Sequence, residues 1–348
     1  MAYNNGLVVG AQVGIREELA DYIAVVDAKS TPLISMAGKG KDIGNMLFSW
    51  QVDNYASPQA GGTADGADFT VSSTNANAST NRTRLYNYAE VFRRGHRTGF
   101  IADTQNVAAV ADETSRAVAK RLVELKRDME AVFACANQPA TAEDNTPTAS
   151  RTGSLGKWMN TTVSAGTAGA PTSTYAPASG AVDTTATASL VESSIQAVLT
   201  AMYTNTGTVR SYDAIVGTTL KRAFTKLTNA VLPAGIDTNA IAATAVRTFN
   251  QEIGDRSFVS TIDVFEGDFG TIRLHPSTFI NTIATATFTA AAFKGYVLPM
   301  EMIEVRYSKL PEVTDLPNAG GGPIKLVQAI AGLVVKNPAG MGMFNATA

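Results

Sequence analysis

The chain has 348 residues, of which 17% are charged, a formal net charge of -2 and one cysteine. This length is enough to bury a core and predicts either two domains or one elaborate domain. The near-neutral charge gives the whole molecule no reason to bind nucleic acid or an anionic membrane, so any such contact must be local. A single cysteine excludes an intramolecular disulfide framework and a cysteine-rich zinc site.

The first residues, 1–43, are predicted to form an arm with one amphipathic helix. Within IREELADYIAVVDAKSTPLISM the apolar residues recur with helical spacing until Thr31-Pro32 ends the pattern; they are Ile15, Leu19, Tyr22, Ile23 and Val26. An ordinary first helix of the core is the alternative. No stretch approaches the roughly 18 to 20 apolar residues of a membrane span, and the N-terminus lacks the pattern of a secretion signal, so no membrane partner is expected.

Residues 44–99 are predicted to form a long hairpin. Phe48, Trp50 and Val52 alternate with polar residues, and a second alternating run follows from Leu85 to Val91. Between these strands lies a tract of Ala, Gly, Ser, Thr and Asn with almost nothing to bury. We therefore expect the hairpin to find its packing partner outside its own chain.

A long helix is predicted from Asp103 to Asn137, with Asp103 or Thr104 as its cap. Apolar residues step by three or four along one face, from Val107 to Val132, and Leu122 lies among them. At about 1.5 Å per residue this helix would be a rod of about 50 Å.

The rest of the chain alternates between low complexity and mixed α/β patterns. Residues 138–180 form a low-complexity connection with an ordered island at 151–158. Residues 181–299 begin with a helix closed by Gly207 and continue with a strand and a helix. The last third is rich in strands and includes a hairpin that turns at Glu266-Gly267-Asp268.

The sequence shows no recognisable catalytic or metal site, because the residues that such sites need are too few or lie in an unsuitable context. His96 lies among arginines, which disfavour a bound cation, and His275 precedes a proline at a strand end. Cys135 is expected to be a small buried hydrophobe. The GKGK stretch at 38–41 lacks the spacing of a phosphate-binding loop. We therefore predict no catalytic residues, no cofactor and no metal.

One basic cluster lies beside the hairpin and consists of Arg82, Arg84, Arg93, Arg94 and Arg97. It could face acidic residues of a neighbouring copy or touch packaged nucleic acid, and the net charge favours the protein partner. The candidate contact residues between subunits are Trp50, Asp53, Asp65, Asp68, Arg82, Arg84, Glu90, Arg93, Arg94 and Arg97.

The order of arm, hairpin, long helix, α/β unit and returning strands resembles the Hong Kong 97 fold of tailed-phage major capsid proteins. Five blocks of the sequence look like a branch of those head proteins long catalogued as a domain of unknown function; they are TPLISMAGKGKDIGNMLFSWQVDNY, AVADETSRAVAKRLVELKRDMEAVF, ASRTGSLGKWM, EGDFGTIRLHPSTF, and MIEVRYSKL followed by GLVVKNPAGMGMF. Two features depart from the family pattern: ADGAD replaces the usual acidic step in the hairpin, and residues 161–180 look like an insertion.

The resemblance implies an α+β fold, with an N-terminal arm at 1–43, an extended loop at 44–99, a peripheral domain at 100–180 that returns with strands at 300–348, and an axial domain at 181–299. It also implies a function, which is self-assembly into hexamers and pentamers of an icosahedral shell that encloses double-stranded DNA. The implied partners are other copies of the chain, a portal, a separate scaffold or a decoration protein, and packaged DNA. The implied location is the virion, after assembly in the host cytoplasm.

Three alternatives remain at this point. A bacterial nanocompartment (encapsulin-like) shell would share the fold, and neighbouring genes for a portal or for a cargo enzyme would separate the two. A tail-tube or decoration protein would lack the long helix. An enzyme with an α/β domain would show a pocket with converging titratable groups.

Overall fold

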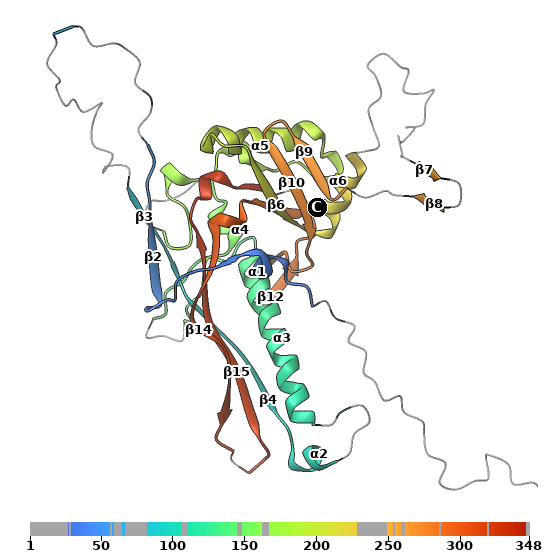
Figure 1. The fold of residues 1–348 in the computed structure, drawn as a ribbon. Helices are drawn as coiled ribbons and strands as arrows, with labels where there is room; N and C mark the ends of the chain where they lie inside the picture. Colours follow the sequence, from blue (N-terminus) through green and yellow to red (C-terminus); the bar gives the residue numbers. More distant parts are fainter. Residues whose placement is uncertain are drawn as a thin grey trace, which may run out of the picture.

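The structure is a computed structural model that describes residues 27, 29–55, 58, 65–66, 82–105, 110, 112–144, 148–161, 167–227, 249–252, 255–258, 262–284, 287–318 and 320–345. The predicted helix of the arm lies outside these residues. Two sheets form the body, one of four strands and one of six (Figure 1).

The four-stranded sheet has the order β1-β14-β15-β4 and carries a long helix on one face. Its strands are β1 (Gly38–Lys39), β14 (Ile303–Leu316), β15 (Ile324–Val335) and β4 (Glu90–Arg97). Strands β14, β15 and β4 are antiparallel, and β1 runs parallel to β14. The helix α3 (Glu113–Phe133) lies alongside β4 and β15, and α2 (Phe100–Thr104) lies at their far end (Figure 1).

The helix α3 is shorter than the sequence predicted. It has 21 residues, about 31 Å of helix, so the predicted rod of about 50 Å is wrong. The Asp112 carboxylate caps the helix by accepting hydrogen bonds from the backbone N–H groups of Thr114 and Ser115 at 3.0 and 3.3 Å. The preceding helix α2 ends at Thr104, because the backbone of Gln105 is extended. The predicted buried face also differs, since Leu125 is fully buried but Leu122 is 37% exposed.

The six-stranded sheet has the order β5-β16-β13-β6-β10-β9. Its strands are β5 (Val182–Asp183), β16 (Gly342–Asn345), β13 (Lys294–Leu298), β6 (Arg210–Val216), β10 (Gly270–Pro276) and β9 (Val264–Gly267). Helices α5 (Glu192–Thr206) and α6 (Thr218–Lys226) pack through a common core on one face. The predicted closure of α5 at Gly207 is confirmed by its left-handed φ of 65°, and the predicted β9–β10 hairpin is confirmed too.

Strand β13 joins the two cores of the molecule. Tyr296 and Leu298 belong to the core under α3 and the four-stranded sheet, whereas Val297 points into the core under α5 and α6. Cys135 is fully buried, as predicted. Strand β4, from the predicted loop range, pairs with β15, and β16, from the predicted last range, lies in the six-stranded sheet; the domain boundaries stay a prediction.

Smaller elements complete the described part of the chain. Helix α4 (Leu155–Trp158) forms the predicted island, and both its end residues are fully buried. The remaining helix and strands are α1 (Pro32–Met36), β2 (Leu47–Val52), β3 (Thr83–Tyr88), β7 (Phe249–Glu252), β8 (Asp255–Phe258), β11 (Asn281–Ala284) and β12 (Thr287–Ala290). Short 3-10 turns lie at Ser173–Tyr175, Ser179–Ala181, Thr187–Ser189, Met300–Met302 and Pro338–Gly340.

Candidate inter-subunit surfaces

The base of the predicted hairpin packs on its own chain. Strands β2 and β3 pair in antiparallel register from Leu47–Tyr88 to Val52–Thr83. The Trp50 indole N–H donates a hydrogen bond of 3.0 Å to the carbonyl of Val335, and its ring lies 5.4 Å from that of Trp158. The expectation that the hairpin buries almost nothing on its own chain is therefore wrong for these strands.

A buried amide fixes this base in place. Asn87 on β3 is fully buried. Its Nδ2 donates hydrogen bonds of 3.1 Å to Thr152 Oγ1 and 2.8 Å to the Leu333 carbonyl, and its Oδ1 accepts one of 2.8 Å from Gly153 N. The amide thus joins the hairpin, the 152–153 segment and strand β15. Contacts within the subunit therefore set the orientation of the hairpin.

The other end of β2 is open to solvent. Asp53 and Asn54 are exposed, and the Tyr55 side chain is 98% exposed. Asp53 lies 3.7 Å from Arg82 across the hairpin, and both side chains of this pair are exposed. An aromatic ring with almost no contact on its own chain is a candidate for burial against a partner. The sequence had given no reason to single out Tyr55.

Three of the predicted contact residues are engaged within the chain. Trp50 packs as described above. Glu90 accepts hydrogen bonds from Gln138 Nε2 at 2.8 Å and Thr152 N at 3.0 Å, and burial raises the pKa of this carboxyl above its ordinary value. Arg94 donates two hydrogen bonds of 2.6 Å to Asp128 on α3. These partners give the three residues intramolecular roles, and their contacts between subunits stay a prediction.

The other predicted residues lie at or near the surface, or outside the described residues. Arg84 is exposed and its guanidinium lies 5.7 Å from the Tyr86 ring centroid, and Arg97 donates a hydrogen bond of 3.1 Å to the Gly321 carbonyl. Arg93 is exposed. Side chains alternate along a strand, so Arg93 and Arg97 lie on the face of β4 opposite to the Arg94 side that meets α3. Asp65 is exposed, and Asp68 lies outside the described residues.

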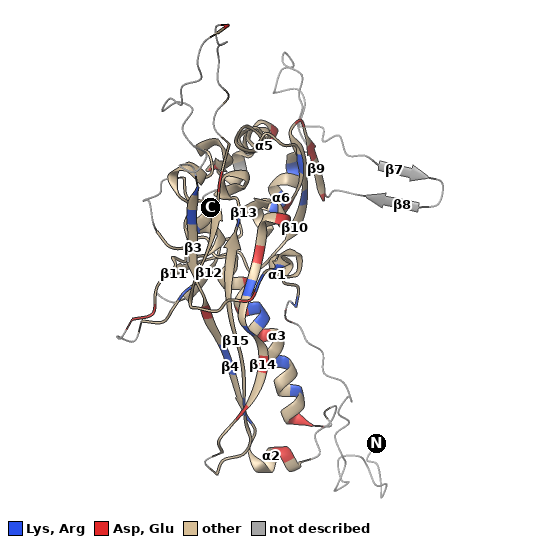
Figure 2. Ribbon diagram, turned by 60° about the vertical axis from the view of Figure 1, so that its left-hand side comes forward, with Lys and Arg blue, Asp and Glu red and all other residues tan. Residues whose placement is uncertain are grey.

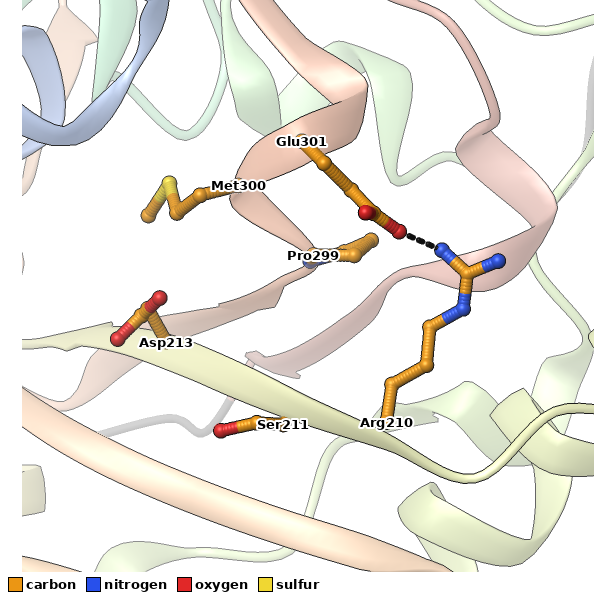
Figure 3. A pocket seen from close by; sticks show the side chains of 6 residues that line it. All are labelled: Arg210, Ser211, Asp213, Pro299, Met300 and Glu301. Carbon is orange, nitrogen blue, oxygen red and sulfur yellow. Dashed lines mark hydrogen bonds and ion pairs between the residues drawn. The ribbon is translucent and has the colours of Figure 1, made fainter.

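A pocket with several titratable side chains lies between β6 and the turn at Met300–Met302. This pocket of about 300 Å³ holds the Arg210–Glu301 ion pair together with Ser211 and Asp213 (Figure 3). His275 Nε2 lies 2.9 Å from Asp213 Oδ1. Ser211 lies two residues before Asp213 on β6, which is about 7 Å along the strand, and no hydrogen bond joins it to His275 in the described structure. The serine hydroxyl is therefore out of reach of the imidazole, and the group does not form a triad.

In the part of the chain that the structure describes, no three His, Cys, Asp or Glu side chains come together in a way that could hold a metal ion. None of the helices in that part is long and apolar enough to cross a bilayer.

Residues 2–348 match the family model described as SU10 major capsid protein. The chain belongs to this family. It is therefore a major capsid protein, a structural protein of the virion and not an enzyme, and it assembles from repeated copies of itself. No curated protein sequence matches the chain.

Solved capsids share the fold of this major capsid protein. The capsid of cyanophage A-1(L) matches with a TM-score of 0.58 at 12% identity, over 95% of this chain and 96% of that chain. The capsid of an empty GTA particle matches with a TM-score of 0.57 at 11% identity over 100% of both chains. Mycobacterium phage Bobi gives a TM-score of 0.54 at 10% identity over 96% of each chain. These similarities confirm the predicted Hong Kong 97 fold.

A second exposed surface of the capsid subunit lies at the far end of its long strands. Exposed apolar side chains gather on β14 and α2; they are Leu310, Val313, Leu316, Phe100 and Ile101, exposed by 51%, 43%, 39%, 56% and 74%. Strand β14 runs through Pro311 to Leu316, because the pairing with β15 shifts register between Lys309 and Glu312 and a proline is tolerated at such an irregularity.

Proposed function

We propose that this major capsid protein assembles into hexamers and pentamers of an icosahedral shell that encloses double-stranded DNA. The observation that carries the proposal is the hairpin, which is anchored in its own core by Asn87 and Trp50 and carries the 98% exposed ring of Tyr55 just beyond strand β2. Such a ring gains free energy when a neighbour covers it. Each contact can be modest, because symmetry repeats it around the shell.

Charged residues would add specificity to the same contacts. Arg93 and Arg97 present positive charge on the face of β4 that α3 does not cover, and Asp65 and Asp68 belong to the loop between β2 and β3. We infer that these groups pair between neighbouring subunits. Along α3 the basic and acidic residues are interleaved (Figure 2), which supports protein contacts more than a dedicated DNA surface.

Other partners follow from family membership and are part of the same proposal. A portal protein, a scaffold or decoration protein, and non-specific contact with packaged DNA complete the head, and assembly takes place in the host cytoplasm. The family match favours this reading over a nanocompartment shell.

Deletion of residues 57–80 tests the proposal. We expect a soluble subunit that keeps the wild-type free energy of unfolding to within about 1 kcal/mol, because the base strands β2 and β3 and their partners remain. The same variant should form no shells, as observed by electron microscopy and by sedimentation. Shells with wild-type thermal stability would contradict the assignment of this loop.

A length-matched control separates the role of the side chains from that of the connection. In it, residues 57–80 are replaced by a Gly-Ser linker of the same length, which closes the hairpin at the same entropic cost. We expect this variant to fold and to fail in assembly like the deletion. If the linker variant assembles normally and the deletion does not, only the length of the loop matters for assembly.

A further inference from the structure

A partly apolar groove runs along the outer side of α3. Its volume is about 310 Å³, and Ala131, Phe279 and Phe288 give it an apolar wall. Phe288 lies on β12, whose four residues are all exposed, and its ring is 46% exposed. An aromatic wall of this kind favours a partner that brings apolar side chains.

The N-terminal part of the chain enters the described structure at the rim of this groove. Arg127 lines the groove, and its Nη1 lies 3.4 Å from Asp27 Oδ2, while its guanidinium lies 5.6 Å from the centroid of the Phe279 ring. The following turn is also fixed, because Glu130 on α3 accepts hydrogen bonds of 2.8 and 2.9 Å from the backbone N–H groups of Leu33 and Ile34 at the start of α1. Asp27, the first residue that the structure describes, is therefore held next to the aromatic wall.

The segment before Asp27 has the amphipathic pattern that an apolar wall favours. Residues 15–26, outside the described part of the structure, carry apolar side chains with helical spacing on one face; they are Ile15, Leu19, Tyr22, Ile23 and Val26. As a helix these twelve positions would extend about 18 Å. The groove is lined by α3 residues from Arg121 to Ala131, a rise of about 15 Å along the helix.

The charged residues that line the groove are three arginines and two acids, and each arginine already has an acidic partner: Arg94 pairs with Asp128, Arg121 with Glu124 and Arg127 with Asp27. The groove therefore offers a partner its apolar wall, and the Asp27–Arg127 pair fixes where the segment ends. We propose that residues 15–26 dock as an amphipathic helix in the groove between α3 and the β11–β12 hairpin of their own chain. The tether at Asp27 favours the same chain over a second copy, because a short connection gives a high effective concentration. This docking concerns the single subunit and does not depend on how shells are built.

Hydrogen exchange of the full-length, unassembled subunit tests the docking. We expect the backbone amides of residues 15–26 to exchange at least tenfold more slowly than an unstructured chain, and Phe288→Asp to remove this protection. The matched control is Val209→Asp, which places the same charge at another apolar position that is 62% exposed, and should leave the protection unchanged. Rapid exchange in the wild type, or protection that survives Phe288→Asp, would overturn the proposal.

Disulfide trapping then identifies the chain that supplies the helix. Phe288→Cys is combined with Leu19→Cys, Tyr22→Cys or Ile23→Cys, and in control pairs with Glu17→Cys or Asp21→Cys on the polar face. The native Cys135 does not interfere, because it is fully buried and burial raises the pKa of its thiol. We expect at least one apolar-face pair to form an intrachain bond at least tenfold faster than the control pairs. Bonds formed only between chains, or at equal rates for both faces, would overturn docking in the same chain.

Discussion

Asn87 holds three segments of the capsid subunit through one buried amide. Replacement by alanine leaves the N–H of Gly153 and the carbonyl of Leu333 without their partner in a site closed to water. We expect Asn87→Ala to lower the free energy of unfolding by about 3 kcal/mol, since each buried polar group that loses its partner costs about 1–3 kcal/mol. Chemical denaturation of the unassembled subunit measures this loss.

The control for this prediction is Asn205→Ala. Asn205 is exposed and donates one hydrogen bond of 3.1 Å to the Ala339 carbonyl, so its loss should cost less than about 1 kcal/mol. Similar costs for the two variants would show that the amide of Asn87 does not fix the hairpin.

Glu130 is a fully buried carboxyl that anchors the start of α1. Burial raises its pKa above the ordinary glutamate value of 4.5, while the hydrogen bonds from Ile34 N and Leu33 N and the charge of Lys126 act in the opposite direction. In the pH range between 4.5 and the raised folded-state pKa, the folded protein keeps a proton that the unfolded chain releases. The contribution of this group to stability is therefore largest below that range and falls as the pH rises through it.

The pH dependence gives a testable prediction. Glu130→Gln can accept only one of the two backbone hydrogen bonds, so it should be less stable than the wild type by about 1–2 kcal/mol at pH 4. The difference should shrink as the pH rises, because the wild type alone must ionise a buried carboxyl. Denaturation curves between pH 4 and pH 8 measure this, with Glu143→Gln at an exposed position as the control. Wild-type and Glu130→Gln stabilities that change in parallel with pH would contradict the prediction.

At the scale of elements, two leucines of α3 show how the structure differs from the sequence pattern. Both fit the predicted apolar face, but Leu125 is fully buried and Leu122 is 37% exposed. We expect Leu125→Ala to lower the free energy of unfolding by about 3 kcal/mol and Leu122→Ala by less than about 1 kcal/mol, because only the first leaves a cavity. The helix propensity changes equally in the two variants, so chemical denaturation reports packing alone. Equal losses would favour the face that the sequence predicted.

The sequence predicted the order and type of the elements better than the residues at which they begin and end. Periodicity was sufficient for α5, β6, α6 and the β9–β10 hairpin, because the local pattern and the tertiary burial agree there. The predicted start of α3 was wrong because the Asp112 side chain caps the helix through local hydrogen bonds, although the apolar pattern continues upstream. Strand β14 runs through Pro311 because its pairing with β15, more than ten residues away in the sequence, is irregular there, and a local pattern does not reveal this.

At the scale of the whole molecule, the partners that the candidate contact residues have within their own chain could not be predicted from the sequence. Charge and aromatic type selected Trp50, Glu90 and Arg94, but composition does not reveal that Val335, Thr152 and Asp128 of the same chain already bind them; these are long-range pairings set by the tertiary fold. Conversely, Tyr55 carries no sequence signal of its own. It is distinguished only by the direction in which the anchored hairpin leaves the core.

Trp50 and Tyr55 lie close together on one hairpin. Substitutions at these two positions therefore distinguish an effect on folding from an effect on assembly. Trp50→Ala removes the hydrogen bond to Val335 and the contact with Trp158, so the unassembled subunit should lose about 3 kcal/mol of its free energy of unfolding. Tyr55→Ser changes a ring that is 98% exposed, and the subunit should unfold as the wild type does to within about 0.5 kcal/mol. If a neighbour covers this ring in the shell, the Tyr55→Ser variant should need a severalfold higher concentration to assemble, because even 1 kcal/mol per contact is a factor of about five. Light scattering against subunit concentration measures that threshold, and an unchanged threshold would mean that Tyr55 stays in solvent after assembly.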